Sequence, residues 1–288
     1  MGMKKLIEML KQWFASLFKK NNENVETPDT AGSTDTNTVI IEEPVNEGND
    51  TQVDEPANEP INEPNDEPIN EPNNDPVPEH KNWKYVILLD NGHASTTPGK
   101  RSPLDKEIPQ FFEYEFNRDI VRRLCDKLDD WGMKFEVIVP EKDVDVSLST
   151  RASRANKLCN LYGVENCIFL SIHANAAGSG KEWMNARGWC CYTSKGETES
   201  DVYAEMFMRE AKKVLEPYGM TIRKYSSHKF SWEDNFTVLV KTRCPAILTE
   251  NLFYDNKDEV KFLQSEEGRE AIVRIHMNAI LNIQNGAV

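Results

Sequence analysis

Proline occupies every fourth position from Pro56 to Pro76, which prevents this part of the chain from forming a regular helix. The surrounding stretch, residues 21–80, holds nine of the fifteen prolines and seventeen acidic residues, with no Lys, Arg, Cys or aromatic residue. Such a composition offers too little apolar surface to offset the entropy of ordering the chain. We therefore expect residues 21–82 to form an extended, self-repelling linker.

The net charge of −14 is concentrated in this linker. Residues 1–20 carry five Lys and one Glu, for +4, and residues 21–80 carry −17, which leaves −1 for residues 81–288. A near-neutral domain excludes the strongly basic surface that tracks a phosphate backbone. No nucleic-acid partner is expected.

Residues 1–20 predict a basic amphipathic helix, because apolar residues recur at spacings of three and four between the Lys residues. Polar residues interrupt any signal-peptide core, and the apolar part is too short to span a bilayer. We expect synthesis in the cytoplasm without a cleavable signal peptide. Three roles for this helix stay open: it could lie on an anionic membrane surface, bind a protein partner or another copy of the chain, or dock on its own domain.

The folded domain is predicted to begin near Trp83 and to extend to residue 288. Continuous apolar runs predict buried strands, and amphipathic patterns between them predict helices. The strands are expected at 84–90, 134–140, 167–173, 188–194 and 246–250, and the helices at 112–131, 148–162, 199–215 and 266–283. This alternation indicates an α/β fold, with a mostly parallel twisted sheet and helices on both faces.

Chemically reactive residues follow the ends of three of these strands. Sheets of this kind bind ligands beyond the carboxyl ends of their strands, where His93, His173 and Glu250 lie. Two His and one carboxylate form a catalytic zinc site in many hydrolases, and a second carboxylate then activates water. The spacings are too long for a local metal motif. On chemistry alone, hydrogen-bonded loop histidines therefore stay an open alternative.

Five short motifs surround these strand ends in a fixed order. They are LLDNGH at 88–93; Glu113 with Asn117; Leu148, Arg151, Ala155 and Asn156; SIHAN at 171–175; and Pro245, Ala246, Glu250, Phe253 and Asn256. Together they resemble the motifs of the zinc-dependent N-acetylmuramoyl-L-alanine amidases of the type 3 class. The likeness extends from about Val86 to Ile283. One departure is Ala94, where the family usually has Gly after the first His.

The resemblance implies that His93, Glu113 and His173 hold Zn²⁺ and that Glu250 is the catalytic carboxylate. It also implies peptidoglycan of the bacterial cell wall as the substrate, cleaved at the amide between the lactyl group of N-acetylmuramic acid and L-alanine. Glu115 is the alternative to Glu113. On a helix the two residues lie about 200° apart, so only one can face the metal.

Four further residues are candidate substrate contacts: Asn175, Lys100, Arg101 and His228. Each is also compatible with an ordinary role in a loop. Two arginines on one helix, Arg151 and Arg154, are expected to be structural, and neither His80 nor His276 is expected to be a ligand. The six Cys are expected to be reduced thiols packed in or beside buried elements.

Two other functions stay open at this point. One is a zinc peptidase that acts on another peptidoglycan amide, and the other is a non-catalytic peptidoglycan-binding protein. The route to the wall also has alternatives: release by a phage-type lysis system, delivery by the N-terminal helix, or action on wall fragments.

Deleting residues 1–20 is expected to abolish co-sedimentation with anionic liposomes while leaving turnover of a soluble muropeptide unchanged. The reason is that the basic amphipathic face would be lost without any change to the predicted catalytic domain. Unaltered sedimentation of the truncated protein would contradict the membrane role.

Overall fold

The structure is a computed structural model that describes residues 82–286. The N-terminal helix predicted over 1–20 and nearly all of the linker predicted over 21–82 lie outside the described residues. Within residues 82–286, no helix combines the length and the apolar character needed to cross a bilayer.

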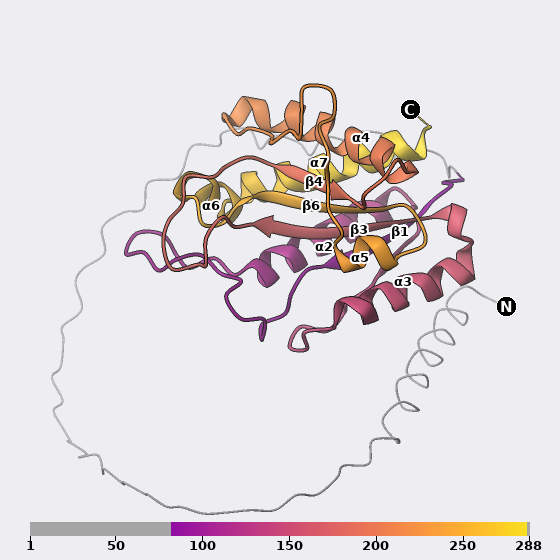
Figure 1. Cartoon of the computed structure of the whole chain (residues 1–288), viewed down its shortest axis with the longest axis horizontal. Helices are drawn as coiled ribbons and strands as arrows, with labels where there is room; N and C mark the ends of the chain where they lie inside the picture. The colour runs from indigo at the N-terminus through magenta and orange to yellow at the C-terminus, as the bar shows by residue number, and fades with distance from the viewer. Residues whose placement is uncertain (1–81, 287–288) are drawn as a thin grey trace, which may run out of the picture. The chain divides into compact units, whose positions relative to one another are not determined.

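A six-stranded sheet forms the centre of the described domain (Figure 1), in the order β2-β1-β3-β6-β4-β5. In this order the first four strands, β2, β1, β3 and β6, are parallel to one another. Strand β4 is antiparallel to β6, and β5 is parallel to β4. The strands are β1 (Val86–Asn91), β2 (Phe135–Val137), β3 (Cys167–Asn175), β4 (Cys190–Thr193), β5 (Trp232–Glu233) and β6 (Ala246–Phe253). The predicted mostly parallel sheet is confirmed.

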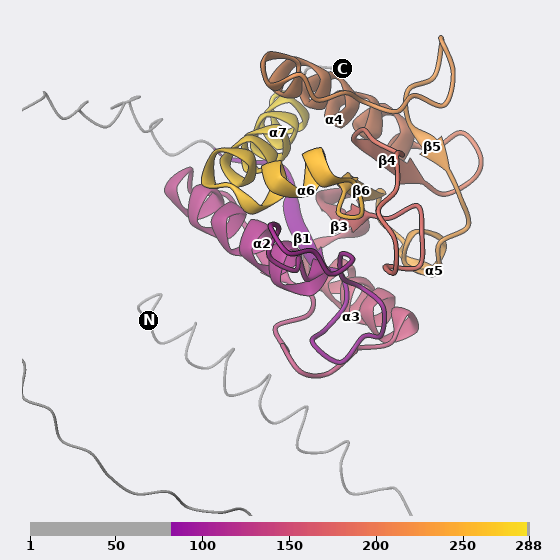
Figure 2. The same ribbon diagram turned by 90° about the vertical axis from the view of Figure 1, so that its left-hand side faces the viewer.

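Helices cover both faces of this sheet, as Figure 2 shows, with α2, α4 and α7 on one face and α3 and α5 on the other. The α-helices are α2 (Glu113–Asp130), α3 (Leu148–Tyr162), α4 (Glu199–Leu215), α5 (Thr237–Lys241), α6 (Lys257–Gln264) and α7 (Glu266–Gln284). Two 3₁₀ turns are η1 (Val164–Asn166) and η2 (Glu216–Tyr218).

The two apolar layers follow from the alternation of side chains along β1. Ile87 and Leu89 belong to the core beneath α2, α4 and α7, whereas Val86 and Leu88 belong to the core beneath α3 and α5. A strand buried on both faces has a continuous apolar sequence, which is why this run predicted a central strand.

Three short elements were not predicted from the sequence: β5, α5 and α6. Each has eight residues or fewer, which is too short for a clear hydrophobic period. A local signal did mark α6, because the Asn256 side chain accepts hydrogen bonds from the N–H groups of Asp258 and Glu259 and so caps that helix. The strand predicted over 246–250 continues to Phe253, while those predicted over 134–140 and 188–194 are shorter than expected.

All six Cys are free thiols, and only Cys125 is partly exposed. His276 is also buried, in helix α7, where its Nδ1 lies 2.7 Å from the carbonyl oxygen of Ile272 and its Nε2 lies 3.0 Å from the Thr249 hydroxyl. Burial lowers the pKa of His276 to about 4, so the imidazole is neutral in the folded chain.

Replacing His276 with Leu is expected to flatten the dependence of stability on acid pH. The unfolded chain protonates His276 near pH 6.5 and the folded chain only near pH 4. The contribution of the neutral imidazole to the free energy of unfolding is therefore complete above pH 6.5 and is lost as the pH falls toward 4. The wild type should lose about 3 kcal/mol of unfolding free energy relative to the variant over that range. Urea unfolding at several pH values measures this difference.

His228→Gln provides the matched control, since His228 is exposed and its replacement should leave the wild-type pH dependence in place. Parallel stability curves for the wild type and His276→Leu would contradict the prediction.

Candidate active site

Three side chains from distant parts of the chain meet at the carboxyl edge of the sheet. His93 follows β1, His173 lies in β3, and Glu113 is the first residue of α2. One potential ligand atom from each lies within 4.8 Å of the other two. Glu113 Oε1 is 3.3 Å from His93 Nε2 and 3.1 Å from His173 Nδ1. Two imidazole nitrogens and a carboxylate at this spacing can hold a divalent metal ion.

The Glu113 carboxylate is buried, with 1% of its surface exposed. Burial alone would raise the pKa of Glu113, but hydrogen bonds to the two imidazoles hold it well below its usual range. Its second oxygen, Oε2, has no hydrogen-bond partner among residues 82–286, and the nearest cation is Lys100 Nζ at 3.9 Å. A buried, unsatisfied carboxylate oxygen is costly unless a cation compensates it, so the donor set fits a metal.

The two imidazoles respond differently to their surroundings. Burial lowers the pKa of His93. Burial acts in the same direction on His173, but the hydrogen bond to Glu113 and the negative charges of Glu113, Glu250 and Asp90 together outweigh it and raise the pKa of His173. Glu115, the alternative carboxylate, is exposed and accepts a hydrogen bond from the Tyr114 hydroxyl at 2.8 Å.

The backbone before His93 is shaped to admit the His173 ring. A Cβ added at Gly92 would lie 2.1 Å from Cε1 of His173, so only Gly fits here. His93 itself has a φ of 64°, a left-handed conformation that is uncommon for a non-Gly residue. The Asn117 side chain donates to the Gly92 carbonyl at 3.1 Å, and Arg118 Nη1 donates to the His93 carbonyl at 2.9 Å.

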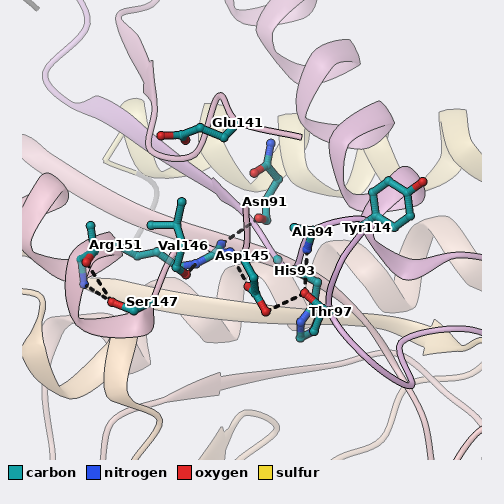
Figure 3. Close-up of polar contacts among 12 residues, drawn as sticks. Asn91, His93, Ala94, Thr97, Tyr114, Glu141, Asp145, Val146, Ser147 and Arg151 are labelled. Atoms are coloured by element: carbon teal, nitrogen blue, oxygen red, sulfur yellow. Dashed lines mark hydrogen bonds and ion pairs between the residues drawn. The ribbon is translucent and has the colours of Figure 1, made fainter. Parts of the chain in front are cut away.

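The loop after His93 is held by hydrogen bonds on its other side (Figure 3). The Ala94 N–H donates to the Thr97 hydroxyl oxygen at 2.9 Å, and that hydroxyl donates to Asp145 at 2.7 Å. Arg151 Nη1 donates to the Asn91 carbonyl at 2.8 Å. Ala94, where the resembled family usually has Gly, therefore lies in a loop that the Thr97 and Asp145 side chains hold in place.

Arg151 also forms a buried ion pair with Asp90, at 2.8 Å between Nη1 and Oδ1. The other Asp90 oxygen accepts a hydrogen bond from Ser171 at 2.7 Å, which joins the ends of β1 and β3. Arg154 pairs with Glu141 on the surface side. Both arginines make the structural contacts expected of them.

A chain of polar groups reaches His173 from helix α7. Asn251 Nδ2 donates to the His173 carbonyl at 2.8 Å and also contacts the Thr249 hydroxyl at 3.3 Å, which in turn contacts His276. Trp189 Nε1 donates to Asn251 Oδ1 at 2.6 Å, so this amide is satisfied on both sides.

Glu250 lies beside the cluster on β6. Its register partner on β3 is His173, and its register partner on β4 is Cys190. Burial raises the pKa of Glu250 to about 7, and the positive charges of His173 and Lys100 oppose that rise. Its Oε2 atom is buried and has no hydrogen-bond partner within the described range. A carboxyl group that titrates near neutrality is suited to accept and return a proton.

The four candidate substrate contacts lie in different settings. Lys100 approaches Glu113, and Asn175 Nδ2 lies 3.8 Å from the Cys190 sulfur beside Glu250. Arg101 is exposed, and its backbone pairs with Phe112. His228 is exposed in a turn where its N–H donates to the Ser226 hydroxyl at 3.3 Å, and no contact joins it to the cluster in the described part of the chain.

The connection from β3 to β4 is held by two acidic side chains that no sequence motif singled out. Asp255 Oδ2 accepts hydrogen bonds from the Ala177 and Gly178 N–H groups, both at 2.8 Å. The buried Glu259 carboxylate accepts from the Gly188 and Phe253 N–H groups, both at 2.7 Å. These side chains, at and before α6, fix the connection to the end of β6.

Replacing Gly92 with Ala is expected to weaken the binding of a divalent metal ion by about 10- to 100-fold, because the new methyl group would displace the His173 ring. Competition with a chromophoric chelator measures the affinity. Gly178→Ala is the matched control, since its Cβ would meet the flexible Met184 side chain at 3.1 Å and Asp255 Oδ2 at an ordinary contact distance of 3.5 Å. Equal metal affinities for the two variants would contradict this account of Gly92.

The sheet and its edge can be compared with known proteins. A structure of the N-acetylmuramoyl-L-alanine amidase from Clostridium difficile 630 superposes with a TM-score of 0.57 at 23% identity, covering 71% of this chain and 98% of that one. This likeness shows a shared fold.

Two relatives are similar in sequence. An endolysin of Bacillus phage SPP1 is 28% identical over 205 residues, which cover 69% of this chain and 66% of the endolysin. The N-acetylmuramoyl-L-alanine amidase CwlM of Bacillus licheniformis is 31% identical over 144 residues, which cover 50% of this chain and 48% of CwlM. The matched part thus spans less than two thirds of either relative.

The family model described as N-acetylmuramoyl-L-alanine amidase matches residues 87–282, which is well over half of the chain and includes every strand from Ile87 onward. The match contains His93, Glu113, His173 and Glu250. This chain therefore belongs to the Amidase_3 family of N-acetylmuramoyl-L-alanine amidases.

Proposed function

We propose that this chain is a zinc-dependent hydrolase of bacterial peptidoglycan. The bond cleaved is the amide between the lactyl group of N-acetylmuramic acid and the L-alanine of the stem peptide. The observation that carries the proposal is the buried convergence of His93, Glu113 and His173 beside Glu250, in a chain of the amidase family. The site of action is the cell wall.

The first three of these residues are proposed to hold the ion. Their two nitrogens and one carboxylate are a preferred set for Zn²⁺ at a catalytic site, which keeps a further position open. A cation between them would compensate the unsatisfied Glu113 oxygen. When bound, Zn²⁺ polarises a carbonyl group and lowers the pKa of water.

Glu250 is proposed to move the proton. It stands next to His173 across the β3–β6 pair, so its carboxylate can take a proton from the attacking water. The same carboxyl group then delivers the proton to the alanine nitrogen, which leaves as a neutral amine. Without that transfer the nitrogen would have to leave as an anion, which is a far poorer leaving group.

Lys100 and Asn175 are proposed to contact the substrate, because they lie beside Glu113 and beside Cys190 respectively. Lys100 would place a positive charge near the oxygen of the amide under attack. The exposed Arg101 and His228 stay predictions from the sequence.

Digestion of purified peptidoglycan, with mass analysis of the products, tests this function. The wild type should release stem peptides that begin at alanine and leave a free lactyl carboxyl group. A chelator should stop the release and added Zn²⁺ should restore it. Glu250→Gln should be slower by about 100-fold or more, because proton transfer is lost.

Glu115→Gln is the matched control, since this exposed carboxylate lies on the same stretch of chain as Glu113 and should keep wild-type turnover. Cleavage products without a free lactyl carboxyl group would instead support a peptidase acting on another amide. No cleavage by folded, zinc-loaded wild type would contradict the proposed function.

A further inference from the structure

Aromatic residues border Glu250 on the side away from His173. Cys190 of β4 is the register partner of Glu250 on that side, and Tyr192 follows two residues later. The Tyr192 ring lies 6.2 Å from the ring of Trp232 on β5. Tyr192 and Trp232 are both partly exposed, so this border is open to a ligand.

Arg223 lies against the same border. Its guanidinium carbon is 5.6 Å from the centre of the Trp232 ring and 5.0 Å from that of Phe253, which comes three residues after Glu250. A guanidinium stacked on aromatic faces keeps its N–H edge free to bind a planar, two-oxygen group. Phe253 is buried and thus provides a rigid support.

The backbone around Arg223 is fixed from both sides. Its N–H donates to the Trp189 carbonyl at 2.8 Å, and its carbonyl accepts a hydrogen bond from Trp232 Nε1 at 2.9 Å. Gly188 lies under the side chain, where a Cβ would come within 2.8 Å of Arg223 Cγ. The guanidinium is therefore held in place before any ligand binds.

No carboxylate and no carbonyl group within residues 82–286 accepts a hydrogen bond from the Arg223 guanidinium, although this residue is partly buried. Burial raises the pKa of the Cys190 thiol to about 12, with the charge of Glu250 adding to the rise and that of Arg223 opposing it. Both charges therefore act on the same side chain. Arg223 thus acts on the β4 neighbour of Glu250, and no carboxylate within residues 82–286 pairs with it.

We infer that Arg223 binds the free α-carboxylate of the second residue of the stem peptide, so that the enzyme favours peptidoglycan in which this group is not amidated. The inference rests on the proposed function. Two residues of extended peptide reach about 7 Å from the scissile bond, and adjacent strands are about 5 Å apart. With the scissile amide at Glu250, the carboxylate would reach the border formed by Tyr192, Trp232 and Arg223.

Two muropeptides that differ only in whether this α-carboxyl group is free or amidated test the inference. The wild type should cleave the free acid with a kcat/KM about 10- to 100-fold higher, mainly through KM, as expected for a charge-assisted pair. Arg223→Gln should remove most of that difference by slowing the acid substrate alone. Arg223→Lys should keep part of it, since the charge remains without the planar fork.

Lys224→Gln is the matched control, because it removes the same charge one residue away, where Lys224 is exposed and stacks on Phe230 at 3.9 Å. It should keep the wild-type preference. Equal cleavage of both substrates by the wild type, or equal slowing of both by Arg223→Gln, would overturn the inference. Failure to cleave either substrate would instead count against the proposed function.

A measurement on the wild type alone covers the case in which Arg223→Gln does not fold. The released peptide with a free α-carboxylate should inhibit the wild type more strongly than the amidated peptide, because only the former pairs with the guanidinium. Equal inhibition by the two peptides would also overturn the inference.

Discussion

The burial of the Glu113 carboxylate between two imidazoles is the interaction on which the rest of the site depends. An ion removed from water loses several kcal/mol of solvation, and only well-placed partners offset that loss. The partners are His93, which follows β1, and His173, which lies in β3, while the carboxylate belongs to the first turn of α2. The parallel pairing of the two strands and the start of one helix thus bring these three side chains together.

The supporting residues act on backbone groups, so that the imidazoles stay free for a ligand. The Gly92, His93 and His173 carbonyls all accept hydrogen bonds from side chains, and none of these donors touches an imidazole nitrogen. The Asn251 donor is itself linked through Thr249 to the buried His276. The position of His173 therefore depends on the packing of α7, on the face of the sheet that α2, α4 and α7 cover.

The sequence predicted the parts of the fold whose physical signal is long and local. The buried strand at β1 and the long amphipathic helices were predicted within a few residues, whereas β5 and α5 are too short to show a period. The motifs also predicted which residues meet at the sheet edge. They gave no sign of Arg223, because its contacts with Phe253 and Trp232 depend on tertiary packing and on no spacing in the sequence.

The antiparallel direction of β4 relative to β6 leaves one segment beside the site free to change in sequence. Because β4 begins at the edge where β3 ends, the whole connection between Asn175 and Cys190 stays at that edge. Asp255 and Glu259 hold it through its backbone N–H groups, which a replacement by any residue other than Pro leaves in place. Its side chains can therefore change and reshape the surface beside the site, while the residues that perform the chemistry keep their positions.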